Sequence, residues 1–122
     1  MNVLANTLDF LRNHPNTADR ALRAYIEAVG VMNHDKELTL KVLAKYFKRS
    51  DPAFLDEMYA IATRYIEKTP RVNARNVATT LEFKPVKGID AETLTAKVID
   101  NSLVDKLARE GFIKQVFGKG IR

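Results

Sequence analysis

Residues 35–66 read DKELTLKVLAKYFKRSDPAFLDEMYAIATRYI, and this stretch predicts two amphipathic helices joined by a short basic turn. Apolar residues recur at intervals of three and four in both halves: Leu40, Leu43 and Phe47 in the first, and Leu55, Met58, Ala62 and Tyr65 in the second. Such spacing places an apolar stripe along each helix. We therefore expect each helix to bury one face.

The turn within this stretch is Ser50-Asp51-Pro52, which ends one helix and begins the next. The Asp51 side chain is a good acceptor for the free N–H groups of the following first turn. Pro52 suits the first helical position, where its missing N–H leaves no hydrogen bond unmade. Because the connection is so short, we expect the two helices to be antiparallel or steeply crossed neighbours.

Composition limits the possible classes of protein. The 122 residues suffice for one domain, 1–122, with a modest core. The hydrophobic share of 46% and the charged share of 29% are typical of an ordered chain. No cysteine is present, which excludes disulfides, thiolate nucleophiles and cysteine-ligated metals. No apolar run approaches the ~20 residues of a membrane span, and the N-terminus lacks the pattern of a secretory signal.

The rest of the chain also has helical patterns. Further helices are expected over 3–12, 17–32 and 74–83, from Asp90, and from Asp100 to Gly111, where glycine favours a left-handed stop. Breaks at Pro15, Pro70 and the 84–90 segment separate them. No convincing strand pattern is present. The predicted fold is all-α, with about six amphipathic helices in an irregular bundle.

Two details of this pattern carry predictions about packing. The 17–32 helix has a regular inner face: Ala18, Leu22, Tyr25, Val29 and Met32. Gly30 is expected to weaken its last turn by roughly 1 kcal/mol relative to alanine. Past Gly111, the apolar residues Ile113, Val116 and Phe117 exceed what a short bundle covers, so we expect an uncovered apolar face and self-association.

The order of several short motifs resembles a known family. These motifs are Asn13-His14-Pro15, Ala21-Leu22-Arg23-Ala24-Tyr25, Leu43-Ala44-Lys45-Tyr46-Phe47-Lys48, Ser50-Asp51-Pro52, Val98-Ile99-Asp100-Asn101-Ser102-Leu103-Val104 and Glu110-Gly111-Phe112-Ile113. In this order the chain is similar, over residues 8–117, to the C-terminal portion of periplasmic substrate-binding proteins of ABC importers. The most similar branch serves nitrate, sulfonates, taurine and thiamine-pyrimidine precursors.

The resemblance implies a non-catalytic role in the uptake of a small organic solute or anion. Family members are periplasmic, have two α/β lobes and a leader peptide, and work with an ABC permease. This chain would correspond to their helical tail alone, without the N-terminal lobes and without a leader. The family's ligand is held mostly by residues upstream of this region, so no ligand-binding residue is transferred. The expected partners are the missing lobe or a second copy of the chain.

Residues with potential chemistry favour structural roles instead. The two histidines, His14 and His34, lie at helix boundaries and lack the HxxxH spacing of a helical metal site. The carboxylates of Asp56, Glu57 and Glu92 are expected in first helical turns, and Ser50 and Ser102 are expected to be helix caps. Gly118-Lys119-Gly120 is too short for a phosphate loop. We therefore predict no catalytic residue, metal or cofactor, and no enzyme.

Two other readings remain open. Residues 38–60 can form a helix-turn-helix that binds nucleic acid through Lys45, Lys48 and Arg49, and the net charge of +5 agrees with this. Acidic residues at the start of its second helix argue against it, because a recognition helix presents that end to DNA. Alternatively, the chain is a small helical adaptor for another protein. Four tyrosines on apolar faces are expected to pack in the core with outward hydroxyls, although an aromatic ligand box is the other interpretation: Tyr25, Tyr46, Tyr59 and Tyr65.

Overall fold

A computed structural model describes residues 4–88 and 90–118, and over these residues the chain is all-helical with eight helices and no strand. The helices are α1 (Leu8–Asn13), α2 (Pro15–His34), α3 (Lys36–Phe47), α4 (Pro52–Tyr65), α5 (Ala74–Phe83), α6 (Ala91–Val98), α7 (Ser102–Arg109) and α8 (Phe112–Phe117). The predicted all-α class is thus confirmed. One addition to the roughly six expected helices is α8, which forms because the chain resumes helical geometry directly after Gly111.

Most helix starts follow from a capping side chain. Asp35 accepts from the N–H of Leu38 at 2.9 Å, and Asp51 accepts from that of Phe54 at 2.7 Å. These bonds satisfy donors that the helix itself leaves free. The sequence predicts that the first helix starts at Val3, which lies outside the described residues. The structure begins α1 at Leu8, because Thr7 Oγ1 accepts from the N–H of Phe10.

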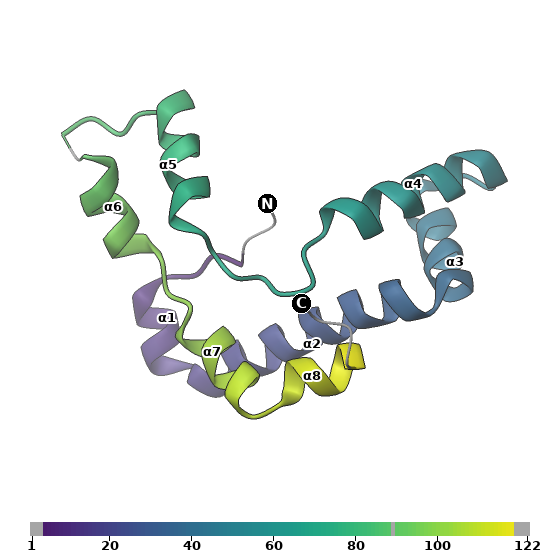
Figure 1. The fold of residues 1–122 in the computed structure, drawn as a ribbon, viewed down its shortest axis with the longest axis horizontal. Coiled ribbons are helices and arrows are strands. Elements are labelled where there is room, and N and C mark those ends of the chain that lie inside the picture. The colour runs from purple at the N-terminus through teal and green to yellow at the C-terminus, as the bar shows by residue number, and fades with distance from the viewer. Residues whose placement is uncertain (1–3, 89, 119–122) are drawn as a thin grey trace.

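The core lies beneath α2 and not in the 35–66 hairpin (Figure 1). α7 and α8 run along α2 and form with it the base of the molecule. Ile26 and Leu107 are fully buried there. Five further buried residues complete this cluster: Leu22, Val29, Val104, Ile113 and Phe117. Each large apolar side chain of this kind contributes about 1.5–3 kcal/mol when it leaves water.

The turn at Gly111 determines the position of α8. Gly111 has φ of +77°, a left-handed conformation that suits glycine, and its N–H donates to the carbonyl of Ala108 at 3.1 Å. The turn brings α8 back onto α2. The prediction that Ile113 and Phe117 are left uncovered is therefore wrong, since both are buried in the core.

Gly30 is required by this contact. A Cβ atom added to Gly30 would overlap Cγ1 of Val116 in α8. The sequence predicts only a weakened last turn at this position, and α2 in fact continues through Gly30 to His34. The glycine allows α8 to approach α2 closely, which is a packing role that helix propensity alone does not reveal.

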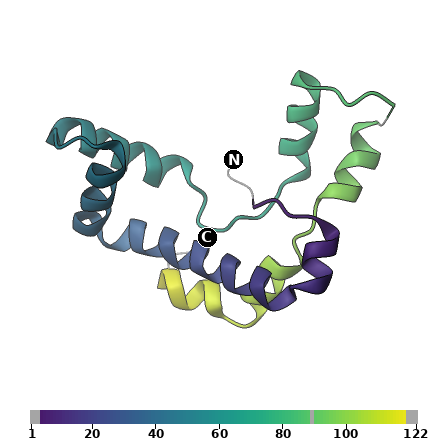
Figure 2. The same ribbon diagram turned by 180° about the vertical axis from the view of Figure 1, so that it is seen from behind.

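Two helical hairpins rise from opposite ends of the base, as both views show (Figures 1 and 2). One is α3–α4, which packs as the predicted neighbouring pair, and the other is α5–α6. The α3–α4 hairpin buries little of its apolar stripes, because only Thr39 and Leu55 are buried within the two helices. Tyr65, expected in the stripe of α4, is exposed. Val98 in α6 is also exposed.

Candidate functional site

The two histidines lie at opposite ends of α2. His14 is the residue before its first turn and His34 is its last residue, which separates them by roughly 30 Å along the helix. The His14 ring lies 5.0 Å from the Phe10 ring, and the His34 ring lies 6.5 Å from that of Phe117. Among the described residues no three histidine or acidic side chains gather in a way that fits a metal ion. The geometry therefore gives the histidines no shared site.

The carboxylates and serines differ in detail from the sequence predictions. Asp56 and Glu57 lie beyond the first turn of α4, whose first turn carries no acid, so that prediction is wrong for both. Asp56 instead pairs with Lys36 of α3 at 2.8 Å. The caps of α4 and α7 are Asp51 and Asn101, because Ser50 precedes the cap and Ser102 is the first helical residue. Glu92 does lie in the first turn of α6.

Of the phosphate-loop candidate, Lys119 and Gly120 lie outside the described residues. Gly118 ends α8 with φ of +70°. Around the α3–α4 turn, Lys48 adopts a left-handed conformation and the Arg49 guanidinium lies 4.4 Å from the centre of the Phe54 ring. Arg49, one of the three cations expected to bind nucleic acid, thus stacks on an aromatic ring of the same α3–α4 hairpin.

The tyrosines do not form one group. Tyr25 packs against the core, and Tyr59 is half-buried with the Lys36 ammonium 5.3 Å from its ring centre. Tyr46 and Tyr65 are 77% and 65% exposed, so the prediction of core packing is wrong for these two. Both are exposed because no described part of the chain packs over the side of α3 that carries Tyr46 or the side of α4 that carries Tyr65.

Two of the motifs that carry the resemblance, residues 21–25 and 110–113, meet in a charged cluster beside the core. Arg23 of α2 donates to Asp19 at 2.7 Å, pairs with Glu110 at the end of α7, and stacks on the Phe112 ring at 4.7 Å. Lys106 of α7 also donates to Asp19, at 2.7 Å. These hydrogen bonds, the one from Lys106 first, hold the pKa of the Asp19 carboxyl below its usual value of 3.8. The cluster ties α7 to α2.

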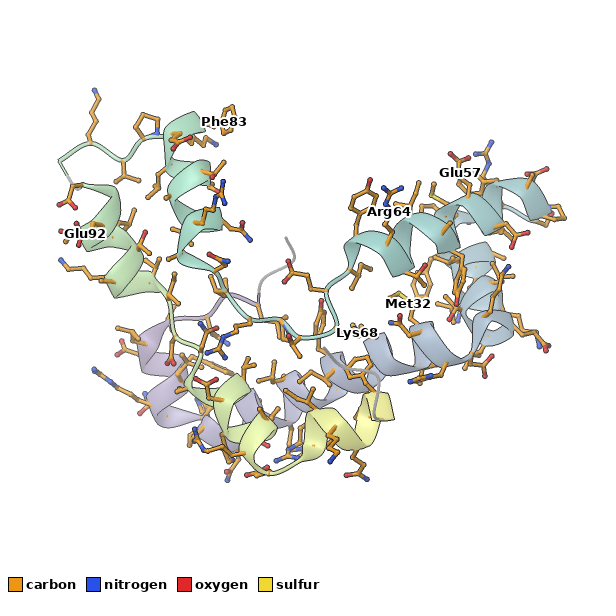
Figure 3. All side chains as sticks on the ribbon, viewed as in Figure 1. Met32, Glu57, Arg64, Lys68, Phe83 and Glu92 are labelled. Carbon is orange, nitrogen blue, oxygen red and sulfur yellow. The ribbon has the colours of Figure 1, made fainter. Side chains whose placement is uncertain are left out.

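A second contact fixes the segment between α4 and α5, residues 66–73. Asn101 Oδ1 accepts from the N–H of Val72 at 2.9 Å, and Asn101 Nδ2 donates to the Val72 carbonyl at 3.0 Å. Arg71 pairs with Asp105 next to them. Figure 3 shows Lys68 where this segment crosses the base, with its ammonium 6.0 Å from the Phe117 ring centre. No local signal in the sequence revealed this longer-range role of Asn101.

Two open hollows flank these contacts. One, of about 430 Å³, is lined by Glu67, Arg71, Val72, Asn73 and Asn76 at the root of α5. The other, of about 280 Å³, lies between α1 and α7 and is lined by Leu8, Leu11, Arg12, Pro15, Ala18, Asp100, Ser102 and Leu103. In the first hollow, the Arg71 charge is already matched by Asp105. In the second hollow, Asp100 accepts from the N–H of Ser102 at 2.8 Å, and a hydrogen bond from the Ser102 side chain holds the pKa of the Asp100 carboxyl below 3.8.

The most distinctive feature is the amount of exposed surface. A folded monomer of 13.8 kDa exposes about 6,600 Å² by the usual size relation, whereas this chain exposes 9293 Å². Large apolar side chains on both hairpins contribute: Leu38, Val42, Tyr46, Phe47, Ile61, Tyr65, Phe83 and Val98. Figure 3 shows Phe83 at the far end of α5, away from the base, and it is 85% exposed. This exposed apolar surface is therefore the candidate functional site.

Three comparisons with known proteins were made. A scan against family models and searches of curated proteins and of solved structures each returned no match. Within the part of the chain that the structure describes, none of the helices combines the length and the apolar character that a membrane crossing requires.

Proposed function

We propose that this chain is the C-terminal helical part of a solute-binding protein of an ABC importer, where it packs against a two-lobed α/β body. In this role it catalyses nothing, and the solute, a small organic molecule or anion, binds in the body. The whole protein acts in the periplasm and delivers its solute to a permease. The order of the sequence motifs supports the proposal, and so does the way their residues pack.

The observation that carries this proposal is the excess of exposed surface, roughly 2,700 Å² over the expectation for a monomer of this size. Permanent interfaces bury about 2,000–5,000 Å² counted over both partners, which is about 1,000–2,500 Å² on each. The excess on this chain is therefore as large as one side of a permanent interface. The exposed side chains of Tyr65, the last residue of α4, and Phe83, the last residue of α5, fit such an interface. A body that covers them would also hold the two hairpins in a fixed relation.

The residues of the resemblance have a clear structural role under this proposal. Arg23 joins the α2 motif to Glu110 and Phe112 of the C-terminal motif, and Asn101 holds Val72 next to Pro70, which is buried. A helical base built in this way is a rigid platform from which both hairpins project. Its residues set the shape of the tail, while contact with the solute is left to the lobes.

The genomic neighbourhood tests the proposal first. We expect a coding region for a two-lobed α/β body in frame with, or directly beside, the coding region of this chain, and a permease gene nearby. A neighbourhood that holds neither would contradict the proposal.

A binding experiment tests it on the bench. The chain and the α/β body are produced as separate polypeptides, mixed and analysed by size-exclusion chromatography with light scattering. We expect a one-to-one complex that Phe83→Asp weakens and that Lys87→Asp, on the adjacent exposed loop, leaves intact. Nitrate, sulfonates and pyrimidines should raise the melting temperature of the complex and not that of the chain alone. A chain that ignores the body would refute the proposal.

A further inference from the structure

One side of α3 carries an apolar stripe that nothing in the described structure covers. Leu38, Val42 and Tyr46 follow each other at intervals of four residues, and they are 45%, 44% and 77% exposed. Residues four apart lie above one another on a helix, so the three side chains form a single row. This row contributes to the excess of exposed surface, but it lies on a different helix from Tyr65 of α4 and Phe83 of α5.

The other sides of α3 are occupied by its neighbours. The Thr39 hydroxyl donates to the carbonyl of Asp35 at 2.8 Å, and Thr39 is buried where α3 meets α2. Leu40 and Leu43 are half-buried, and the Phe47 ring meets that of Phe54 in α4 edge-on at 5.6 Å. The stripe therefore points away from both α2 and α4, and no described part of the chain covers it.

The charges along α3 are arranged asymmetrically. Asp35 and Glu37 lie at its start, where the charge of Lys36 is matched by Asp56 of α4 at 2.8 Å, and Lys45, Lys48 and Arg49 lie at or just past its end. If a second α3 lies antiparallel on the first, the acidic start of each helix faces the basic end of the other. The same contact therefore forms at both ends of the helix pair. The two helix dipoles also oppose each other in this orientation. Lys41 near the centre is held by Glu37 of its own helix at 2.7 Å, which moderates repulsion between the two copies of Lys41.

We propose that a second copy of this chain docks on the α3 stripe, with the two α3 helices antiparallel about a two-fold axis that passes near Val42. A two-fold interface uses the same patch on both copies, and this patch is complementary to itself in charge and continuous in apolar character. The inference concerns the chain by itself and is independent of the proposed solute-uptake role.

The size of the stripe limits the strength of this association. A 12-residue helix is about 18 Å long, which is short for a specific interface that needs about 1,000 Å² in total. We therefore expect a dimer that dissociates on dilution and weakens as salt screens the end-to-end ion pairs. Sedimentation velocity over a wide concentration series, at low and at high salt, measures both effects.

A matched pair of variants locates the interface. Val42→Glu places two carboxylates against each other at the two-fold axis, whereas Val31→Glu changes an equally exposed valine, 44% in both cases, on α2. We expect Val42→Glu to raise the dimer dissociation constant at least about tenfold, the effect of 1.4 kcal/mol, and Val31→Glu to change it little. Circular dichroism confirms that both variants keep their helix content.

A charge exchange tests the orientation. Glu37→Lys makes both ends of α3 basic, and Lys45→Glu places an acidic residue towards each end. In a dimer of either variant like charges would face each other, so each variant alone should fail to self-associate. Mixed together, the two variants should form a heterodimer, because each basic flank then meets an acidic one.

Three results would overturn the proposal. The first is a wild-type chain that sediments as a monomer at every concentration. The second is a dimer that Val31→Glu and Val42→Glu weaken equally. The third is a mixture of the charge-exchange variants that stays monomeric.

Discussion

The side-chain amide of Asn101 forms two hydrogen bonds with the backbone of Val72, one to its N–H at 2.9 Å and one to its carbonyl at 3.0 Å. Asn101 precedes α7 by one residue, and Val72 precedes α5 by two. The pair therefore joins the two connections that lead into and out of the α5–α6 hairpin, and it anchors that hairpin to the base.

Replacement of Asn101 should loosen this anchor. Asn101→Ala leaves two partly buried backbone groups of Val72 without these bonds, which is expected to lower the free energy of unfolding by about 1–3 kcal/mol. Asn101→Asp keeps the acceptor and loses the donor, so its effect should be intermediate. Urea denaturation measures the changes, and Asn16→Ala, at an exposed position in α2, serves as the control. Equal losses for the Asn16 and Asn101 variants would show that the anchor contributes nothing.

Gly30 offers a second test, because helix propensity and packing predict opposite effects of Gly30→Ala on stability. Gly30→Ala should stabilise α2 by roughly 1 kcal/mol if propensity alone applies. The new Cβ atom would overlap Val116, however, so we expect a net loss of stability of about 1–3 kcal/mol.

The double variant Gly30→Ala with Val116→Ala removes the overlap. Its unfolding free energy should exceed the value predicted from the sum of the two single changes, by at least about 0.5 kcal/mol. Additive behaviour in this cycle would mean that the two positions are not in contact.

The Asp19 carboxyl gives a pH-dependent prediction. Its pKa lies below 3.8 in the folded chain, because Lys106 and Arg23 donate to it. A group with a lowered folded pKa binds more protons when unfolded, so its stabilising contribution is complete above about pH 5 and is lost as the pH falls through 3.8 and the folded pKa. Asp19→Asn should therefore be less stable than the wild type at pH 7. The difference should shrink as the pH falls below 3.8.

Urea denaturation across this pH range checks the sign. Other carboxyls, including Asp105, titrate in both chains, so only the difference between wild type and variant is used. A difference that is constant with pH would contradict a role for the Asp19 charge.

Substitution of two phenylalanines, one in the base and one in a hairpin, compares how much each part contributes to stability. Phe117 is 5% exposed in the core beneath α2, and Phe83 is 85% exposed at the end of α5. Phe117→Ala is expected to cost about 3–5 kcal/mol, which is a large part of the stability of a small domain. Phe83→Ala should leave the unfolding free energy of the isolated chain within about 0.5 kcal/mol. Thermal unfolding of both variants measures the contrast, and similar losses would place the core elsewhere.

Local chemistry made several elements predictable from the sequence. The Asp35 and Asp51 caps, the 74–83 helix and the stop at Gly111 all depend on residues close to one another in the chain. Caps, proline and glycine act over one or two turns, so their effects appear in the sequence pattern.

Long-range packing was not predictable in the same way. The fully buried Ile26 lies on the correct helix, yet the pattern alone did not identify it as the centre of the core. The burial of Phe117 depends on a turn that brings α8 back onto α2, and Gly30 is explained only by Val116. Conversely, the regular stripe that ends in Tyr65 predicted burial, but the described chain supplies no layer to cover it.

We propose that α2, α7 and α8 form the stable core and that the α3–α4 and α5–α6 hairpins depend on a partner for full burial. Native-state hydrogen exchange on the isolated chain, dilute enough to be monomeric, tests this most directly. We predict slow exchange along α2, α7 and α8, and exchange at least about tenfold faster in α5 and α6. Uniform protection across all the helices, or slower exchange in the hairpins than in α2, would contradict the account.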